Sequence, residues 1–203
     1  MFGKGRLEAF SDGVLAIVIT IMVLELKAPY GSRFLDLEKL FPKLFSYVLS
    51  FTYVAIYWNN HHHMFSLVPK IDGRILWANI HLLFWLSLIP FSTSWMGETD
   101  FTQLSTMIYG VVLLMCSIAY QILQKTIIAL QGGQSDLKRA LGKDFKGRAS
   151  IALYAAGIAA DLVLPAVSIL FYMAVAVMWI IPDRRIERYH FSRGRGDESG
   201  QGR

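Results

Sequence analysis

The chain has 203 residues, of which 54% are hydrophobic and only 17% are charged, and its formal net charge is +5. This composition, with a mean hydropathy of +0.42, excludes an ordinary soluble globule and predicts an integral membrane protein. The single cysteine, Cys116, lies in an apolar run, so an intrachain disulfide framework is excluded and redox chemistry has no support.

Six stretches approach the roughly 20 mostly apolar residues that a helix needs to cross the hydrocarbon core of a membrane. They cover residues 10–26, 40–58, 75–95, 104–123, 149–164 and 166–181. The last two form one apolar block that is too long for a single crossing, and Asp161 and Pro165 within it favour a hairpin over one kinked helix. The sequence therefore predicts an all-α, polytopic fold with six transmembrane helices over residues 1–182. The basic segment 183–203 is expected to be a disordered cytoplasmic tail.

The distribution of basic residues predicts the orientation. With the N-terminus in the cytoplasm, 16 of the 20 lysines and arginines fall in cytoplasmic segments. This bias predicts that both termini are cytoplasmic. It also accounts for the basic net charge, so the sequence predicts no nucleic-acid partner, whereas membrane lipid is an expected partner of the tail. Lys4 and Arg6 before the first span would also suit a signal peptide, but Asp12 and the lack of a small-x-small cleavage pattern favour a mature helix.

The first span carries one apolar face with a single hydroxyl, Thr20. At ~100° per residue, the residues that share this face are Phe10, Gly13, Val14, Ile17, Thr20, Ile21 and Leu24. Such a face is typical of ordinary helix packing, and it would equally suit the wall of a pore. The pattern alone leaves both interpretations open.

Asp12 lies on roughly the opposite side of the same helix, by the same rotation. A carboxylate in a membrane helix is costly and normally has a partner. Arg6 and the histidines of the segment 58–65, which the topology places at the same end, are the expected partners. We therefore expect a polar clamp that fixes the first helix against the second and third.

A motif at the head of the first span points to a family. Arg6, Phe10, Ser11 and Asp12 spell R-x-x-x-F-S-D, which resembles the signature of the transmembrane protein 175 family of potassium channels. The segment YWNNHH that ends the second span and Asn79 in the third are also similar to prokaryotic members. The resemblance implies a potassium-selective cation channel without a re-entrant filter, in the plasma membrane of a prokaryote. It further implies a homotetramer whose first helices line a central pore, with no cofactor besides the permeant K+.

The resemblance also implies roles for individual residues. Their positions after the motif imply pore constrictions at Ile17, Ile21 and Leu24, and a polar pore layer at Thr20. A structural network around the motif is expected to comprise Arg6, Phe10, Ser11, Asp12, His61, His62 and Asn79.

The consecutive histidines His61, His62 and His63 support a competing hypothesis, a membrane metalloprotein or a carrier of metal or other ions. Imidazole is the commonest metal ligand. Against this, neighbouring residues on a helix point ~100° apart, so the three rings cannot converge on one ion without unwinding. The sequence also contains no nucleophile with a placed base and no paired intramembrane carboxylates, so a channel is predicted rather than an enzyme.

Overall fold

The structure is a computed structural model that describes residues 3–29, 31, 33–132, 135–141 and 144–180. Over these residues the chain is all-helical, as predicted, whereas the predicted tail 183–203 lies outside them. In chain order the helices are α1 (Lys4–Leu24), α2 (Phe34–Glu38), α3 (Phe41–Ser66), α4 (Gly73–Ser87), α5 (Ile89–Glu98), α6 (Gln103–Gln131), α7 (Asp136–Leu141), α8 (Phe145–Asp161) and α9 (Pro165–Ile180).

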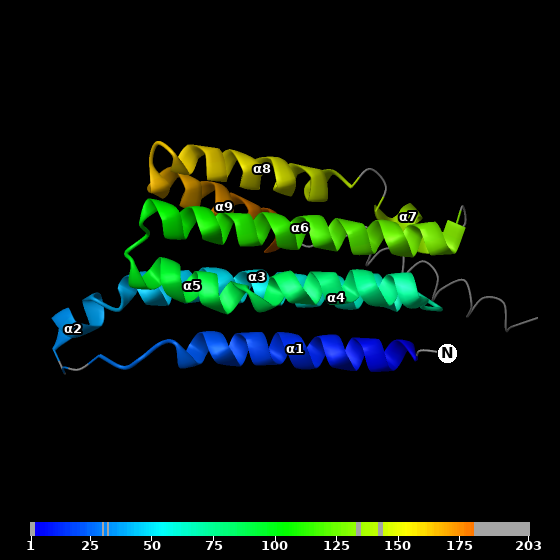
Figure 1. Cartoon of the computed structure of the whole chain (residues 1–203), viewed down its shortest axis with the longest axis horizontal. Coiled ribbons are helices and arrows are strands. Elements are labelled where there is room, and N and C mark those ends of the chain that lie inside the picture. The colour runs from blue at the N-terminus through cyan, green and yellow to red at the C-terminus, as the bar shows by residue number, and fades with distance from the viewer. Residues whose placement is uncertain (1–2, 30, 32, 133–134, 142–143, 181–203) are drawn as a thin grey trace, which may run out of the picture.

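The long helices run side by side along the long axis of the molecule (Figure 1). α1 forms one edge and packs against α3, α4 and α5. α6 packs against α4 and α5 on one side and against α8 and α9 on the other. α1 therefore lies at the opposite edge of the bundle from α8 (Figure 1).

Three segments of the described chain are long and apolar enough to cross a membrane: α1, the continuous stretch Gly73–Glu98 that contains α4 and α5, and α6. α3, α8 and α9 correspond to the other three predicted spans. α8 and α9 are short, with 17 and 16 residues. α3 extends to Ser66, beyond its predicted end at residue 58, because its polar last turns find partners. For example, Asn60 Nδ2 donates to the carbonyl of Ile56 at 2.8 Å.

Two prolines lie at interruptions of the helices. α4 and α5 separate at Leu88, because Pro90 has no backbone N–H to continue the helical bonding pattern. Pro165 begins α9 after the turn 162–164, in which the amides of Val163 and Leu164 both donate to the carbonyl of Ala160. α8 and α9 run antiparallel (Figure 1), so the hairpin interpretation of this block is correct.

The start of α4 is fixed by a side-chain cap. Asp72 Oδ1 accepts a hydrogen bond from the backbone amide of Ile75 at 2.9 Å, and Oδ2 accepts one from Arg74 Nε at 3.1 Å. The bond from the Ile75 amide is the main reason that the pKa of Asp72 lies below its usual value. The cap sets the first turn of the helix that carries Asn79.

Glycines allow close packing between α6, α8 and α9. A Cβ atom on Gly110 would overlap the Tyr172 hydroxyl, and one on Gly157 would approach the Tyr172 ring to 2.7 Å. Both glycines are therefore needed for the position of the buried Tyr172, whose hydroxyl donates to the carbonyl of Thr106 at 3.5 Å.

Gly110→Ala is expected to destabilise the bundle by about 1–3 kcal/mol, because the added methyl group forces Tyr172 out of a well-packed site. The thermal unfolding midpoint of the protein in detergent measures this effect. Gly73→Ala is the control, since a Cβ at Gly73 meets nothing within 4 Å. Equal midpoints for the two variants would contradict this account of the packing.

Candidate functional site

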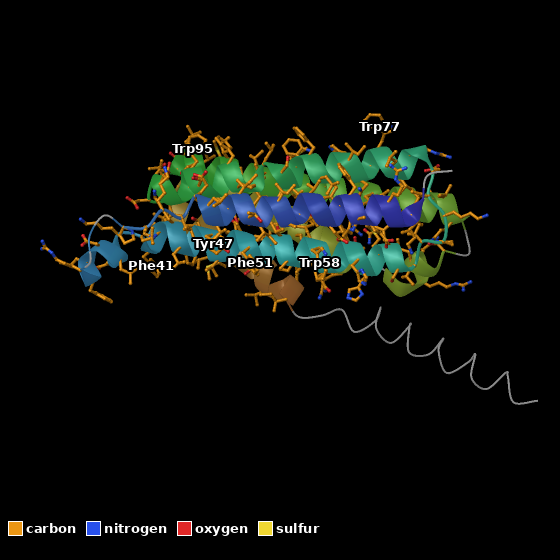
Figure 2. The ribbon with its side chains drawn as sticks, turned by 90° about the horizontal axis from the view of Figure 1, so that it is seen from below. Phe41, Tyr47, Phe51, Trp58, Trp77 and Trp95 are labelled. Carbon is orange, nitrogen blue, oxygen red and sulfur yellow. The ribbon has the colours of Figure 1, made fainter. Side chains whose placement is uncertain are left out.

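α1 has two distinct faces. Leu7, Ser11, Leu15, Val18 and Met22 are buried against the rest of the chain. The opposite face is open: Ile17 is 60% exposed and Leu24 is 71% exposed, whereas Val18 is only 3% exposed. Figure 2, which views the molecule from the side of α1, shows α1 between α3 and α4–α5 with no other described helix in front of it. The open face is the apolar face recognised in the sequence.

Thr20 lies on this open face together with Ile17, Ile21 and Leu24. Its hydroxyl donates to the carbonyl of Ala16, one turn earlier, at 2.8 Å. The hydroxyl hydrogen is therefore used within the helix, and the oxygen lone pairs remain available to a group outside the chain.

A buried chain of hydrogen bonds joins α1 to α3 and α4. Asn79 Nδ2 on α4 donates to Ser11 Oγ on α1 at 2.9 Å, and Ser11 Oγ donates to the carbonyl of Leu7 at 2.9 Å. His61 Nε2 on α3 lies 2.8 Å from Asn79 Oδ1. Because an amide oxygen only accepts, the imidazole must carry its proton on Nε2. All three side chains are at most 3% exposed, so the contacts between the helices are shielded from water.

Asp12 lies beside this chain and has a different partner from the expected ones. Its Oδ1 accepts a hydrogen bond from Trp58 Nε1 on α3 at 3.0 Å (Trp58 is labelled in Figure 2). The His62 ring stacks on the Trp58 ring with 6.3 Å between centroids. Asp12 and Ser11 thus connect α1 to both α3 and α4, and Trp58 is a contact that the motif did not reveal.

Arg6 and Phe10 lie apart from these contacts. Both side chains are exposed, and no ion pair between Arg6 and Asp12 occurs among the described residues. At ~100° per residue, Arg6 falls on the same side of α1 as Ile17 and Phe10. The structure therefore brings together Ser11, Asn79 and His61, and separately Asp12, Trp58 and His62.

The histidine cluster does not form a metal site. Within the part of the chain that the structure describes, no group of three or more His, Cys, Asp or Glu side chains could hold a metal ion. His61 is hydrogen-bonded to Asn79, and the His62 ring stacks on the Trp58 ring. The metalloprotein alternative therefore has no support.

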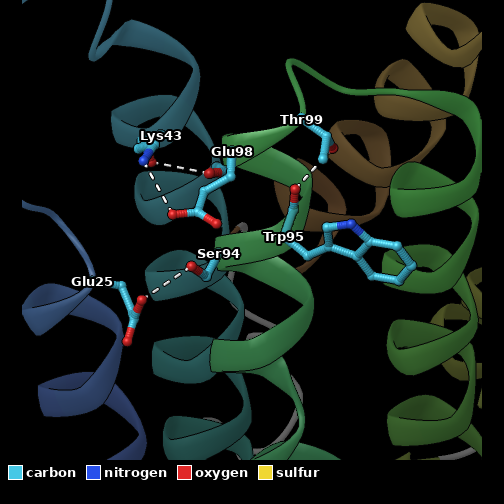
Figure 3. Close-up of polar contacts among 7 residues, drawn as sticks. Glu25, Lys43, Ser94, Trp95, Glu98 and Thr99 are labelled. Atoms are coloured by element: carbon cyan, nitrogen blue, oxygen red, sulfur yellow. Dashed lines mark hydrogen bonds and ion pairs between the residues drawn. The ribbon is translucent and has the colours of Figure 1, made fainter.

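The C-terminal end of α1 has its own contacts, which the sequence did not predict (Figure 3). Glu25 accepts a hydrogen bond from Ser94 Oγ on α5 at 3.2 Å. Nearby, Lys43 Nζ on α3 pairs with Glu98 Oε1 on α5 at 3.2 Å. Between α1 and α5 lies an open groove of about 570 Å³, lined by Ile21, Glu25, Ser87, Pro90, Phe91, Ser94, Trp95 and Glu98. No local pattern signalled these contacts, because they join residues 55 to 69 positions apart.

Comparison with known proteins places this arrangement in a family. Residues 6–90, which contain the motif and the buried chain of hydrogen bonds, match the family described as "Endosomal/lysosomal potassium channel TMEM175". A potassium channel of Chryseobacterium sp. (strain P1-3) is 55% identical over 185 residues, which cover 91% of this chain and 96% of that protein. The chain belongs to the TMEM175 family. It is therefore related to ion channels and not to enzymes.

Other TMEM175 proteins resemble the chain in fold and sequence. The crystal structure of a lysosomal potassium-selective channel TMEM175 homolog from Chamaesiphon minutus superimposes with a TM-score of 0.77 at 27% identity. The match covers 89% of this chain and 97% of that one. The endosomal/lysosomal proton channel TMEM175 of Mus musculus is 27% identical over 61% of this chain, a region that covers only 25% of the mouse protein.

Proposed function

We propose that this TMEM175 protein is one subunit of a potassium-selective channel in which the α1 helices of four copies line a central pore. One observation carries the proposal: between Phe10 and Leu24, α1 presents an apolar face, interrupted only by Thr20, that the rest of the described chain leaves largely uncovered. One helix face cannot enclose a pore, so a closed wall built from this face requires several copies of the chain. The bacterial relatives named as potassium channels support the choice of ion.

In the proposed pore, Ile17 forms the narrowest ring, and Ile21 and Leu24 form wider rings toward the outer side. A ring of isoleucines offers an ion no oxygen, so it blocks by dewetting when it is narrow. Potassium loses hydration water more readily than sodium, and the Thr20 oxygens replace part of that water one turn further out. Discrimination between potassium and sodium in the proposed pore thus depends on the free-energy cost of dehydrating each ion, rather than on a filter of backbone carbonyls.

The contacts at the inner half of α1 serve the pore by fixing the helix that lines it. Ser11, Asn79 and His61 hold α1 through buried bonds, and Asp12 holds it through Trp58 and His62. We assign this positioning role to Ser11 and Asp12 of the motif. Arg6 and Phe10, which lie on the open face, are assigned to contacts between copies.

The proposed membrane arrangement follows from the charge bias and the helix order. Six crossings, made by α1, α3, α4–α5, α6, α8 and α9, place both termini in the cytoplasm of a prokaryote. Residues 1–182 form the channel domain in the plasma membrane. The basic segment 183–203, which lies outside the described residues, is proposed to bind anionic lipid headgroups.

The proposal is tested with purified protein in liposomes. Potassium efflux should exceed sodium efflux at equal gradients, and light scattering of the detergent-solubilised protein should give the mass of four chains. A stable monomer that retains flux would exclude a pore shared between copies. Absence of flux from correctly inserted tetramers would exclude the channel itself.

Thr20→Val is expected to reduce potassium selectivity while leaving assembly unchanged, because it removes the only hydroxyl from the open face at nearly constant volume. The reversal potential under a potassium–sodium gradient measures the effect. Thr52→Val on α3 is the matched control, since Thr52 is partly exposed and makes the same bond to the carbonyl four residues earlier at 2.8 Å. If both variants lose potassium selectivity to the same extent, Thr20 does not line the pore.

A further inference from the structure

The outer end of α6, α8 and α9 contains a buried carboxylate that the proposed pore does not use. Asp161, the last residue of α8, is 0% exposed. Its Oδ1 accepts one hydrogen bond, from Ser168 Oγ at 3.3 Å. Its Oδ2 is buried and has no hydrogen-bond partner. A buried carboxylate with one neutral donor is poorly compensated, because burial removes the water that would otherwise solvate its charge.

A second unsatisfied oxygen lies on α6, one turn from Gln103, which contacts the backbone of Asp161. Thr106 on α6 is also 0% exposed, and its Oγ1 has no partner. The carbonyl of Thr106 accepts the Tyr172 hydroxyl, and Gln103, one turn earlier on α6, donates through Nε2 to the carbonyl of Asp161 at 2.9 Å. Asp161 and Thr106 therefore supply two of the three unsatisfied buried side-chain atoms found among the described residues.

No positive charge in the described chain neutralises Asp161. The ion pairs found there join Lys43 to Glu98 and Arg74 to Asp72, and neither involves Asp161. Helix dipoles compensate the charge only in part, because Asp161 lies at the negative end of α8 while α9, whose positive end is at Pro165, contributes a partial positive charge. A water molecule would satisfy the hydrogen bonds but would leave the charge in place.

We propose that Asp161 Oδ2 and Thr106 Oγ1 bind an alkali-metal cation at the outer end of the α6–α8–α9 layer. Carboxylate and hydroxyl oxygens are hard ligands that suit such ions. A single carboxylate matches one positive charge, whereas divalent calcium is normally held by several acidic ligands. The site lies across the bundle from α1 (Figure 1), so it is separate from the proposed pore and fixes the α8–α9 hairpin to α6.

The test measures the thermal unfolding midpoint of the full-length protein in detergent at one pH, with sodium or potassium chloride replacing choline chloride at constant ionic strength. An ion that binds only the folded state raises the midpoint with its concentration. We expect this rise in the natural protein and its loss in Asp161→Asn. Thr106→Val should need about tenfold more cation for the same rise, because one ligand is removed, while Thr106→Ser should behave like the natural protein.

Asp100→Asn is the matched control, since Asp100 is exposed near the same end and asparagine tolerates its backbone φ of 49°. It should keep the full response to cation. If Asp161→Asn also keeps it, the cations act elsewhere, such as in the pore, and the proposal is wrong. If the thermal unfolding midpoint changes with pH but not with the concentration of sodium or potassium, Asp161 is protonated rather than bound to a cation, and the proposal is also wrong. Should Asp161→Asn fail to fold, the contrast between Thr106→Val and Thr106→Ser decides the question. None of these outcomes depends on ion flux.

Discussion

Ile17→Ala is expected to raise potassium flux about tenfold, equivalent to a barrier lower by ~1.4 kcal/mol, and to reduce discrimination between potassium and sodium. In the proposed pore, shortening four facing isoleucines widens and wets the ring that an ion must cross without oxygen ligands. Because Ile17 is 60% exposed and makes little contact within its own chain, the variant should fold and assemble normally. Flux from liposomes, compared at equal protein density, measures the change.

The control for Ile17 has to be an exposed aliphatic residue on another side of α1. Val18 is unsuitable, because it is only 3% exposed and Val18→Ala would remove packing from the core. Val23 is 45% exposed and lies roughly 120° around the helix from Ile17. Val23→Ala should leave flux and selectivity nearly unchanged. If the two variants conduct alike, the open face of α1 is a packing surface and not a pore wall.

Asn79→Leu is expected to lower the free energy of unfolding by an amount on the order of 2–5 kcal/mol, a larger loss than that of Gly110→Ala. The leucine fills a similar volume but leaves His61 Nε2 without its acceptor and Ser11 Oγ without its donor. Each group is buried and has lost water as an alternative partner. The thermal unfolding midpoint and the yield of assembled protein report the loss.

Asn60→Leu serves as the comparison for Asn79→Leu. The Asn60 side chain is only partly buried and donates within its own helix to the carbonyl of Ile56, so its removal leaves no donor from another helix unpaired. We expect Asn60→Leu to lower the free energy of unfolding by less than about 1 kcal/mol. Similar unfolding midpoints for the two variants would show that the bonds between α1, α3 and α4 contribute little to the fold.

The positions of the helices were predictable because apolar run length depends on local sequence alone. The turn between α8 and α9 was also predictable, since Pro165 after Asp161 is a local signal. The open face of α1 followed from the helical period, and the helix is indeed buried only on the other side, at residues such as Leu15 and Val18. Boundaries were less accurate: α1 begins at Lys4 and α3 continues to Ser66, because polar ends of these helices remain helical.

Contacts between helices were not predictable in the same way. Asp12 was expected to pair with a charged or imidazole group, yet it bonds to the Trp58 indole, because the relative rotation of α1 and α3 decides which side chain faces it. The bond between Glu25 and Ser94 likewise depends on where the break at Leu88 directs α5. Periodicity fixes the faces of one helix but not the rotation of its neighbours.

The two ends of α1 are attached to the bundle with very different strength. The N-terminal half is held by buried hydrogen bonds through Ser11, whereas beyond Met22 the side-chain hydrogen bond from the C-terminal end to α5 is the exposed one between Glu25 and Ser94. Exposed contacts of charged groups contribute about 0–1 kcal/mol and weaken further in salt. We therefore expect thermal motion of α1 to be largest near Leu24, so that in the proposed pore the ring at Leu24 changes diameter more than the ring at Ile17, and more so at high ionic strength.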